Sequence, residues 1–261
     1  MKPVDAKQGQ PARRVGWLLG PVVVARSSDA SDDEVLAQAY DLAIAAVVDV
    51  KSCPIGNTNS EHIREGAAAS GVGLVVLPGS LVATFEGRHR LHEAVASARP
   101  VLVAKSRFGG GPVMVVADAP RAGLGALAVA ADEARRLARP LLVVHAAEGM
   151  VGVAKGELGP VSAMSLRACL ETIRRHWGVA AETRAIDSPC VPALSSLADA
   201  LSARLIVLGT WGGTGPDELA RMQRMLDIAR AAPCSVLLLP PSPDVNPRVA
   251  GRLQPAASLS T

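Results

Sequence analysis

Short apolar runs alternate with amphipathic stretches along the second half of the chain. Four of these runs are rich in Val, Leu and Ile, and we expect a buried strand at each of 113–117, 141–145, 205–208 and 235–239; a further strand is expected at 179–186. The stretches between them carry apolar residues at helical spacing and predict helices after residue 122 and near 162–177, 192–203 and 216–231. Strands that alternate with helices in this way are typical of a doubly wound parallel sheet.

Two of these helices show clear apolar faces. In the helix after residue 122, the face expected to be buried carries Leu124, Leu127, Ala128, Ala131 and Ala134. Its charged residues are expected on the opposite, solvated face: Asp132, Glu133, Arg135 and Arg136. In the helix at 216–231, the residues expected to be buried are Leu219, Met222, Leu226 and Ala229.

The first half of the chain repeats part of this pattern. The run at 73–77 matches 204–208, and the run at 98–103 loosely matches 232–238. A helix predicted at 60–70 precedes the first run, as the helix at 192–203 precedes its match. These matches predict an internal repeat of about 130 residues. The first copy is shorter by roughly one strand–helix unit, and whether 21–25 is its first or its second strand stays open.

Glycine and proline mark the boundary between the copies. The strongest break is Gly-Gly-Gly-Pro at 109–112, which predicts one domain over 15–108 and another over 112–241. The flanking segments 1–14 and 242–261 are polar or rich in Pro, Ala and Ser, and we expect flexible tails there.

Composition narrows the class of protein. Apolar residues make up 49% of the chain and aromatic residues only 2%, which favours parallel sheets covered by helices on both faces. The net charge is only +3 and no basic tract alternates with aromatics, so nucleic-acid binding is not expected. No apolar stretch approaches the ~20 residues of a membrane span, so no membrane partner is expected. Scattered cysteines are typical of reduced thiols and indicate a cytoplasmic protein.

One segment resembles an export signal. Arg13 and Arg14 precede an apolar run at 15–25. Asp5 lies in the leader, however, and Arg26 ends the run without a small-residue cleavage site, so a buried first strand is the favoured interpretation.

Catalytic constellations are absent from the sequence. The five histidines have no Cys or acid at a metal-site or nucleophile spacing, and there is no G-x-S-x-G motif. His89 and His92 lie one helical turn apart, but two ligands without a third predict no metal site. We therefore expect a protein that binds rather than catalyses.

Four segments, in their order along the chain, resemble the universal stress protein family. They are Val-Met-Val-Val-Ala-Asp at 113–118, Leu-Leu-Val-Val-His-Ala at 141–146, Leu-Ile-Val-Leu-Gly-Thr-Trp-Gly at 205–212 and Ala-Ala-Pro-Cys-Ser-Val-Leu-Leu-Leu at 231–239. The resemblance covers 112–241 and, more weakly, 60–106. It implies two Rossmann-like or flavodoxin-like parallel-sheet units of the adenine nucleotide alpha hydrolase type, the first truncated. It also implies a role in stress response.

The resemblance implies a nucleotide site in the second copy. ATP-binding members carry G-x-x-G, nine residues, then Gly followed by Ser or Thr, because glycines let the backbone approach phosphate oxygens closely. Gly209 and Gly212 fit the first pair, and Asp118 fits the acid that contacts the nucleoside. Met222-Gln223 stands where Gly-Ser/Thr is expected, so the motif is degenerate. In the first copy, the sequence at 78–81 is Pro-Gly-Ser-Leu, and its site is expected to be lost.

Several interpretations stay open at this point. The first is weak binding of ATP or another adenine nucleotide, with no other cofactor, and with Arg221 and Arg224 as a source of positive charge. The second is an interaction protein whose sites have decayed. The third is an NAD-type enzyme that uses Gly-Leu-Gly-Ala-Leu-Ala at 123–128, which fits G-x-G-x-x-A but lies too far from the preceding strand.

The last strands of the two copies are expected to meet. In the resembled family, fifth strands pair across dimers, and here 101–104 and 235–239 are the candidates to pair within one chain as an internal pseudo-dimer. Such pairing would cover apolar edge strands that otherwise invite aggregation. Association of two whole chains into a homodimer is left open.

Overall fold

A computed structural model gives the arrangement of most of the chain. It describes residue 18 and residues 20–26, 32–54, 71–97, 99–105, 109–116, 123–146, 170–171, 173–186, 190–209 and 216–240. In chain order the elements are β1 (Val22–Arg26), α1 (Asp32–Ala46), β2 (Val50–Pro54), β3 (Leu74–Pro78), α3 (Gly79–Val82), α4 (Phe85–Ala96), β4 (Val101–Ala104), β5 (Val113–Val116), α5 (Gly123–Arg136), β6 (Leu141–Ala146), β7 (Ala181–Ile186), α7 (Cys190–Ala200), β8 (Leu205–Gly209), α8 (Pro216–Ala231) and β9 (Ser235–Leu239). We call helical residues 170, 171 and 173–177 the Trp177 helix.

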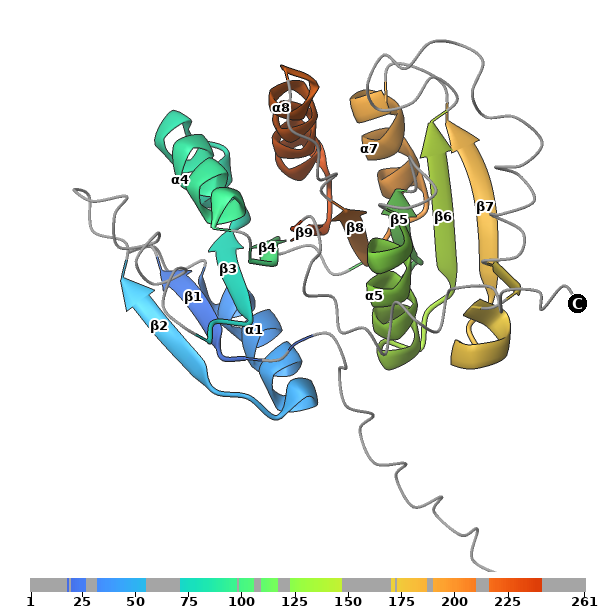
Figure 1. Cartoon of the computed structure of the whole chain (residues 1–261), viewed down its shortest axis with the longest axis horizontal. Coiled ribbons are helices and arrows are strands. Elements are labelled where there is room, and N and C mark those ends of the chain that lie inside the picture. Colours follow the sequence, from blue (N-terminus) through green and yellow to red (C-terminus); the bar gives the residue numbers. More distant parts are fainter. Residues whose placement is uncertain are drawn as a thin grey trace, which may run out of the picture.

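The described strands form a single mixed sheet. Its order is β2-β1-β3-β4-β9-β8-β5-β6-β7 (Figure 1). Every neighbouring pair is parallel except β4 and β9, which are antiparallel, with Leu102 opposite Leu237. The predicted meeting of 101–104 with 235–239 is therefore confirmed, and the mostly parallel α/β fold class is confirmed with it.

The strand order is the same when it is read outward from the β4–β9 pair. One side runs β4-β3-β1-β2 and the other runs β9-β8-β5-β6, followed by β7. β1 thus lies between β2 and β3 as β5 lies between β6 and β8, so the apolar run at 21–25 occupies the position of a first strand. The described strands include no counterpart of β7, and residues 55–70, with the helix predicted at 60–70, lie outside the described residues. Truncation of the first copy therefore stays a prediction.

The two halves also correspond residue by residue in their first strand–helix units. Val22 and Val113 each begin a strand 91 residues apart. Val47 and Ala138, again 91 apart, end the helices with positive φ values of 59° and 53°. In both halves the next residue donates its N–H to a helical carbonyl five positions back: Val48 to Ala43 and Arg139 to Ala134. This shift gives a basis for comparing α1 with α5.

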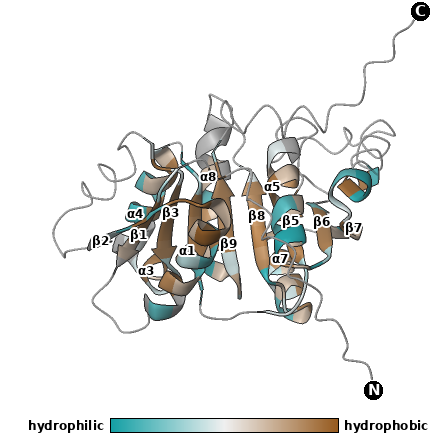
Figure 2. Cartoon of the chain, turned by 90° about the horizontal axis from the view of Figure 1, so that it is seen from below, coloured by the Kyte–Doolittle hydropathy of each residue, from teal (hydrophilic) through white to brown (hydrophobic). Residues whose placement is uncertain are grey.

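Helices cover the sheet on both faces. α1, α5 and the Trp177 helix pack into one apolar cluster, which includes Leu42, Ala130 and Trp177. α4, α7 and α8 pack into a second cluster on the other face, with Leu91, Leu194 and Ile228. Figure 2 shows the apolar strands between these helices. Alternate residues of each strand belong to opposite clusters, as the pleat requires. Within the described ranges, no helix has the length and apolar composition to cross a membrane.

Most predicted elements of the second half are present, with two differences. α8 and β9 begin and end where they were predicted, whereas α7 begins at Cys190 and ends at Ala200. The expectation that Arg136 and Glu133 face solvent is wrong, because the Arg136 side chain is 15% exposed and Glu133 is only 1% exposed. Its carboxylate is paired with Arg136 at 2.9 Å, which is how a buried charge is tolerated.

Candidate functional site

The carboxyl ends of β5 and β8 lie side by side. β5 pairs with β8 in parallel, with Val116 opposite Leu208. The chain leaves β5 toward α5 on one face of the sheet and leaves β8 toward α8 on the other face. Neighbouring parallel strands whose connections depart to opposite faces create a crevice at their carboxyl ends, and open α/β sheets bind ligands there.

One of the three predicted binding residues is described. Gly209 is the last residue of β8, is buried, and pairs with Leu239 of β9. Asp118 and Gly212 lie outside the described residues, so their proximity to Gly209 stays a prediction. Asp118 follows Val116, the end of β5, by two positions in the sequence.

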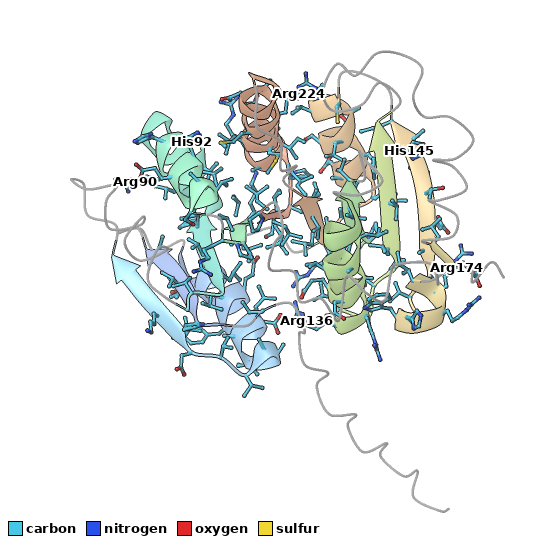
Figure 3. The ribbon with its side chains drawn as sticks, in the orientation of Figure 1. Arg90, His92, Arg136, His145, Arg174 and Arg224 are labelled. Carbon is cyan, nitrogen blue, oxygen red and sulfur yellow. The ribbon has the colours of Figure 1, made fainter. Side chains whose placement is uncertain are left out.

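The residues that replace the second part of the glycine motif are used by α8 itself. Met222 is half-buried and packs against the apolar cluster beneath α8. Gln223 is exposed, and its side-chain amide donates to Asp227 Oδ1 at 3.2 Å one turn later. Met222 therefore contributes to the core, as its spacing indicated. Arg224 is half-buried on α8 (Figure 3), and the side chain of Arg221 lies outside the described residues.

The corresponding connection in the first half is closed by its own backbone. After β3 the chain passes directly into α3, and Thr84 then caps α4. Thr84 Oγ1 accepts from the Gly87 N–H at 2.9 Å and donates to the Leu81 carbonyl at 2.9 Å. A Cβ on Gly87 would lie 1.7 Å from the Leu81 oxygen. The turn thus packs against the start of α4, and one of the N–H groups that could bind a phosphate is already satisfied.

The glycine pattern at 123–128 lies within a helix. α5 begins at Gly123, so Gly123 and Gly125 belong to its first turn and do not follow directly on β5, which ends at Val116. A dinucleotide fingerprint needs its first glycine in the strand-to-helix turn. This placement does not favour an NAD-type site.

His145 is a polar residue at the same edge of the sheet to which the sequence assigned no role. It is the fifth residue of β6, near the strand's carboxyl end (Figure 3). Its Nδ1 atom is buried and has no hydrogen-bond partner. Buried polar nitrogens are usually paired, so this atom is a candidate for contact with a ligand. The sequence signal that could have identified this residue is a single histidine near the end of an otherwise apolar strand. Among the described residues, no three His, Cys, Asp or Glu side chains come together as metal ligands.

The far end of α8 is held by the first half of the chain. Lys105, which follows β4, donates from Nζ to the carbonyls of Arg230 and Ala232 at the C-terminus of α8. Burial lowers the pKa of Lys105, and burial raises the pKa of the neighbouring Cys234 thiol to about 11. The backbone N–H of Lys105 also donates to Ser235 Oγ at 3.0 Å, and Ser235 Oγ donates to Gln38 Oε1 at 2.8 Å. These bonds fix α8 relative to the β4–β9 pair.

A second crevice lies between α1 and α5, and ion pairs fill its polar side. Arg136 pairs with Asp41 of α1 at 2.7 Å as well as with Glu133. Burial alone would lower the pKa of Arg136, but the carboxylates of Glu133 and Asp41 raise it. The apolar side of the crevice is formed by leucines: Leu42, Leu102, Leu137, Leu205 and Leu237. This crevice joins the halves and lies away from the carboxyl ends of β5 and β8.

Comparison with known proteins agrees with this geometry. Residues 111–240 match the family model of the universal stress protein family. Comparison with curated protein sequences gives no match. The fold is similar to that of a functionally unknown protein from Pseudomonas aeruginosa PAO1, with 16% identity, a TM-score of 0.59, and coverage of 90% of this chain and 95% of that one.

A universal stress protein from Archaeoglobus fulgidus DSM 4304 is also similar. It shows 19% identity and a TM-score of 0.53, with coverage of 82% of this chain and 77% of that one. At these identities the structural similarities speak for the fold alone. Together with the match over residues 111–240 and the strand order, they lead to one conclusion: the chain belongs to the universal stress protein family.

Proposed function

We propose that this chain is a cytoplasmic, non-enzymatic stress-response protein that binds ATP or another adenine nucleotide weakly in its second half. The two halves act as tandem domains over 15–108 and 112–241. The observation that carries the proposal is the difference between two connections. The first-half turn is closed by Leu81 and Thr84, whereas β8 ends in Gly209 beside β5, at a position where such sheets bind ligands.

Weak binding follows from the replaced half of the motif. A phosphate needs open backbone close to its oxygens, and Met222 is half-buried in the core instead. Arg221 and Arg224 of α8 then supply positive charge toward an anionic ligand. If the double variant Arg221→Ala/Arg224→Ala binds ATP as the wild type does, this role of the two arginines is wrong.

Titration calorimetry with ATP tests the proposal. We expect saturable heat with the wild-type chain and none with Gly209→Val, because the added side chain fills the end of β8. Ser80→Val is the matched control, since Ser80 is exposed in the first-half turn and the change should leave the heat unaltered. No heat with the wild type up to millimolar ATP would refute nucleotide binding.

The alternative is an interaction protein whose nucleotide sites have decayed. The burial of Met222 favours it, because this residue stabilises the core and offers nothing to a phosphate. Absence of ATP binding together with normal thermal stability would support this alternative, and partners would then be sought directly.

A further inference from the structure

An apolar stripe runs along one flank of α1. Among the described residues, the large apolar side chains that are well exposed are Tyr40, Ile44 and Val47, at 52%, 73% and 71%. Their spacing of four and three residues places them on one side of the helix. We call these three residues the α1 stripe. Exposed large apolar side chains that gather on one face, rather than singly, mark a contact surface.

Val47, the last residue of the stripe, has an unfavourable backbone conformation. Val47 has φ of 59°, a left-handed conformation that a β-branched residue rarely adopts. Ala138 and Ser202 hold the same kind of conformation after α5 and α7, and both are small. Val47 is thus the largest apolar side chain among these three positions, and it lies at the end of the stripe.

The second half shows what covers such a flank. On α5 the position that corresponds to Tyr40 is Ala131, which is fully buried, and the equivalents of Ile44 and Val47 are Arg135, which is half-buried, and Ala138, which is exposed. The Trp177 helix lies on the side of α5 away from α1 (Figure 1), and Trp177 Nε1 donates to Asp132 Oδ1 at 3.0 Å. Ile173 and Trp177 of this helix are buried in the cluster that α5 shares. The part of this flank at Ala131 and Asp132 is thus covered by a short amphipathic helix.

That covering helix is basic on its outer side. Arg174, Arg175 and His176 are exposed, and so is Glu171, which pairs with Arg175 at 3.6 Å. The described residues of the first half include no counterpart of the Trp177 helix. The crossover from β2 to β3 is expected on the face of α4, α7 and α8, because such crossovers are right-handed. Within the described part of the chain, Tyr40 of the α1 stripe is therefore left uncovered at the position where the other half receives a basic amphipathic helix.

Charge supports the same occupant. α1 carries four acidic residues and no Lys or Arg in its sequence, Asp-Asp-Glu-Val-Leu-Ala-Gln-Ala-Tyr-Asp-Leu-Ala-Ile-Ala-Ala. Asp33 is exposed, and the side chain of Asp41 is 56% exposed. A second copy of α1 would bring acids against acids. The adjacent edge strand β2 contains Lys51 and Pro54, which disfavour addition of a strand.

We propose that the α1 stripe is a docking surface for a basic amphipathic helix of a partner protein. The partner's apolar residues, three and four positions apart, pack on Tyr40, Ile44 and Val47, and its Lys or Arg side chains face Asp33, because Asp41 is already paired with Arg136. This surface lies in the half opposite to the proposed nucleotide site and does not depend on that site.

A capped, fluorescent peptide of about 18 residues tests the proposal, with Trp and Leu at i, i+4 and i+7 and with Lys or Arg at most other positions. Anisotropy titrations should show saturable binding to the wild-type chain. Ile44→Glu should weaken the affinity at least about tenfold, because a charge then lies at the centre of the contact. Ser196→Glu adds the same charge at an exposed position of α7 and should leave the affinity for the peptide unchanged. Circular dichroism checks that both variants are folded.

Three results would overturn the proposal. The first is no binding to the wild type, or equal binding to Ile44→Glu. The second is a wild-type dimer, seen by sedimentation, that Ile44→Glu converts to a monomer, which would assign the stripe to a second copy. The third is binding that appears only after deletion of residues 1–16, which would assign it to the chain's own N-terminal segment.

Discussion

β3 and β8 have equivalent places in the sheet, yet the connections that follow them differ. β3 lies between β1 and β4, and β8 lies between β5 and β9. β3 ends in Pro78 and continues at once into α3, and Thr84 then satisfies the first turn of α4. β8 ends in Gly209, and α8 does not begin until Pro216. The same strand order thus supports one closed turn and one candidate site, so function must be argued from the connection and not from the fold.

The helices α1 and α5 differ in the side chain that each buries at an equivalent position. Leu42 of α1 corresponds to Glu133 of α5, and both are buried. α1 buries an apolar side chain at this position, whereas α5 buries a carboxylate that must be paired with Arg136. The second half thus depends on an internal ion pair that the first half does not have.

The largest expected effect comes from making α5 resemble α1 at this position. Glu133→Leu leaves the largely buried Arg136 with only Asp41, and we expect a loss of about 3 kcal/mol in the free energy of unfolding. Chemical denaturation measures it. The double variant Glu133→Leu/Arg136→Leu removes both charges and should recover most of the loss. If the single variant costs nothing, the ion pair does not hold the second half together.

A smaller effect is expected from the closed turn of the first half. Gly87→Ala forces a methyl group against the Leu81 carbonyl, and the turn must shift at a cost of about 2 kcal/mol. Thr84→Ala removes the cap without adding an atom and should cost about 1 kcal/mol. Thermal denaturation measures both. Neither variant should change ATP binding; a change would mean that the first-half turn takes part in the site.

The last effect depends on pH and distinguishes the residues that precede the paired strands β4 and β9. Pro100 precedes β4 and does not titrate, whereas Cys234 precedes β9 and has its pKa raised to about 11 by burial. A raised pKa stabilises the protonated thiol in the folded state, so this stability is complete below pH 9 and declines toward pH 11. From the two pKa values, 9.0 and about 11, the wild type should lose about 1.4 kcal/mol more than Cys234→Ala between pH 7 and pH 10. Equal losses would contradict the burial of the thiol.

The sequence predicted the second half well because its strands, apart from β7, are unbroken apolar runs. α8 and β9 were placed correctly, and the β4–β9 pair was expected from the resemblance to a family whose fifth strands pair, in agreement with the need to cover two apolar edge strands. α1 and β2 were not predicted. The apolar residues of α1 extend around most of the helix, including the α1 stripe, and β2 reads Val-Lys-Ser-Cys-Pro, so neither shows the period that marks an element.

The candidate site was predicted only in outline. Gly209 lies where the motif placed it, and Met222 packs in the core as its spacing indicated. The burial of Glu133 could not be predicted, because helical periodicity assigns charged residues to the solvated face whether or not they have a partner. The lack of a hydrogen-bond partner for His145 Nδ1 could not be predicted either, because it depends on the residues that surround the end of β6.

Hydrogen exchange with and without millimolar ATP, read by mass spectrometry, tests most directly that the two halves differ in ligand binding. The account predicts slower exchange in peptides from 113–130 and 205–231, and no change in peptides from 74–96. Protection of 74–96 to the same extent would contradict the asymmetry between the two connections. No protection anywhere would contradict nucleotide binding and leave the interaction protein as the better description.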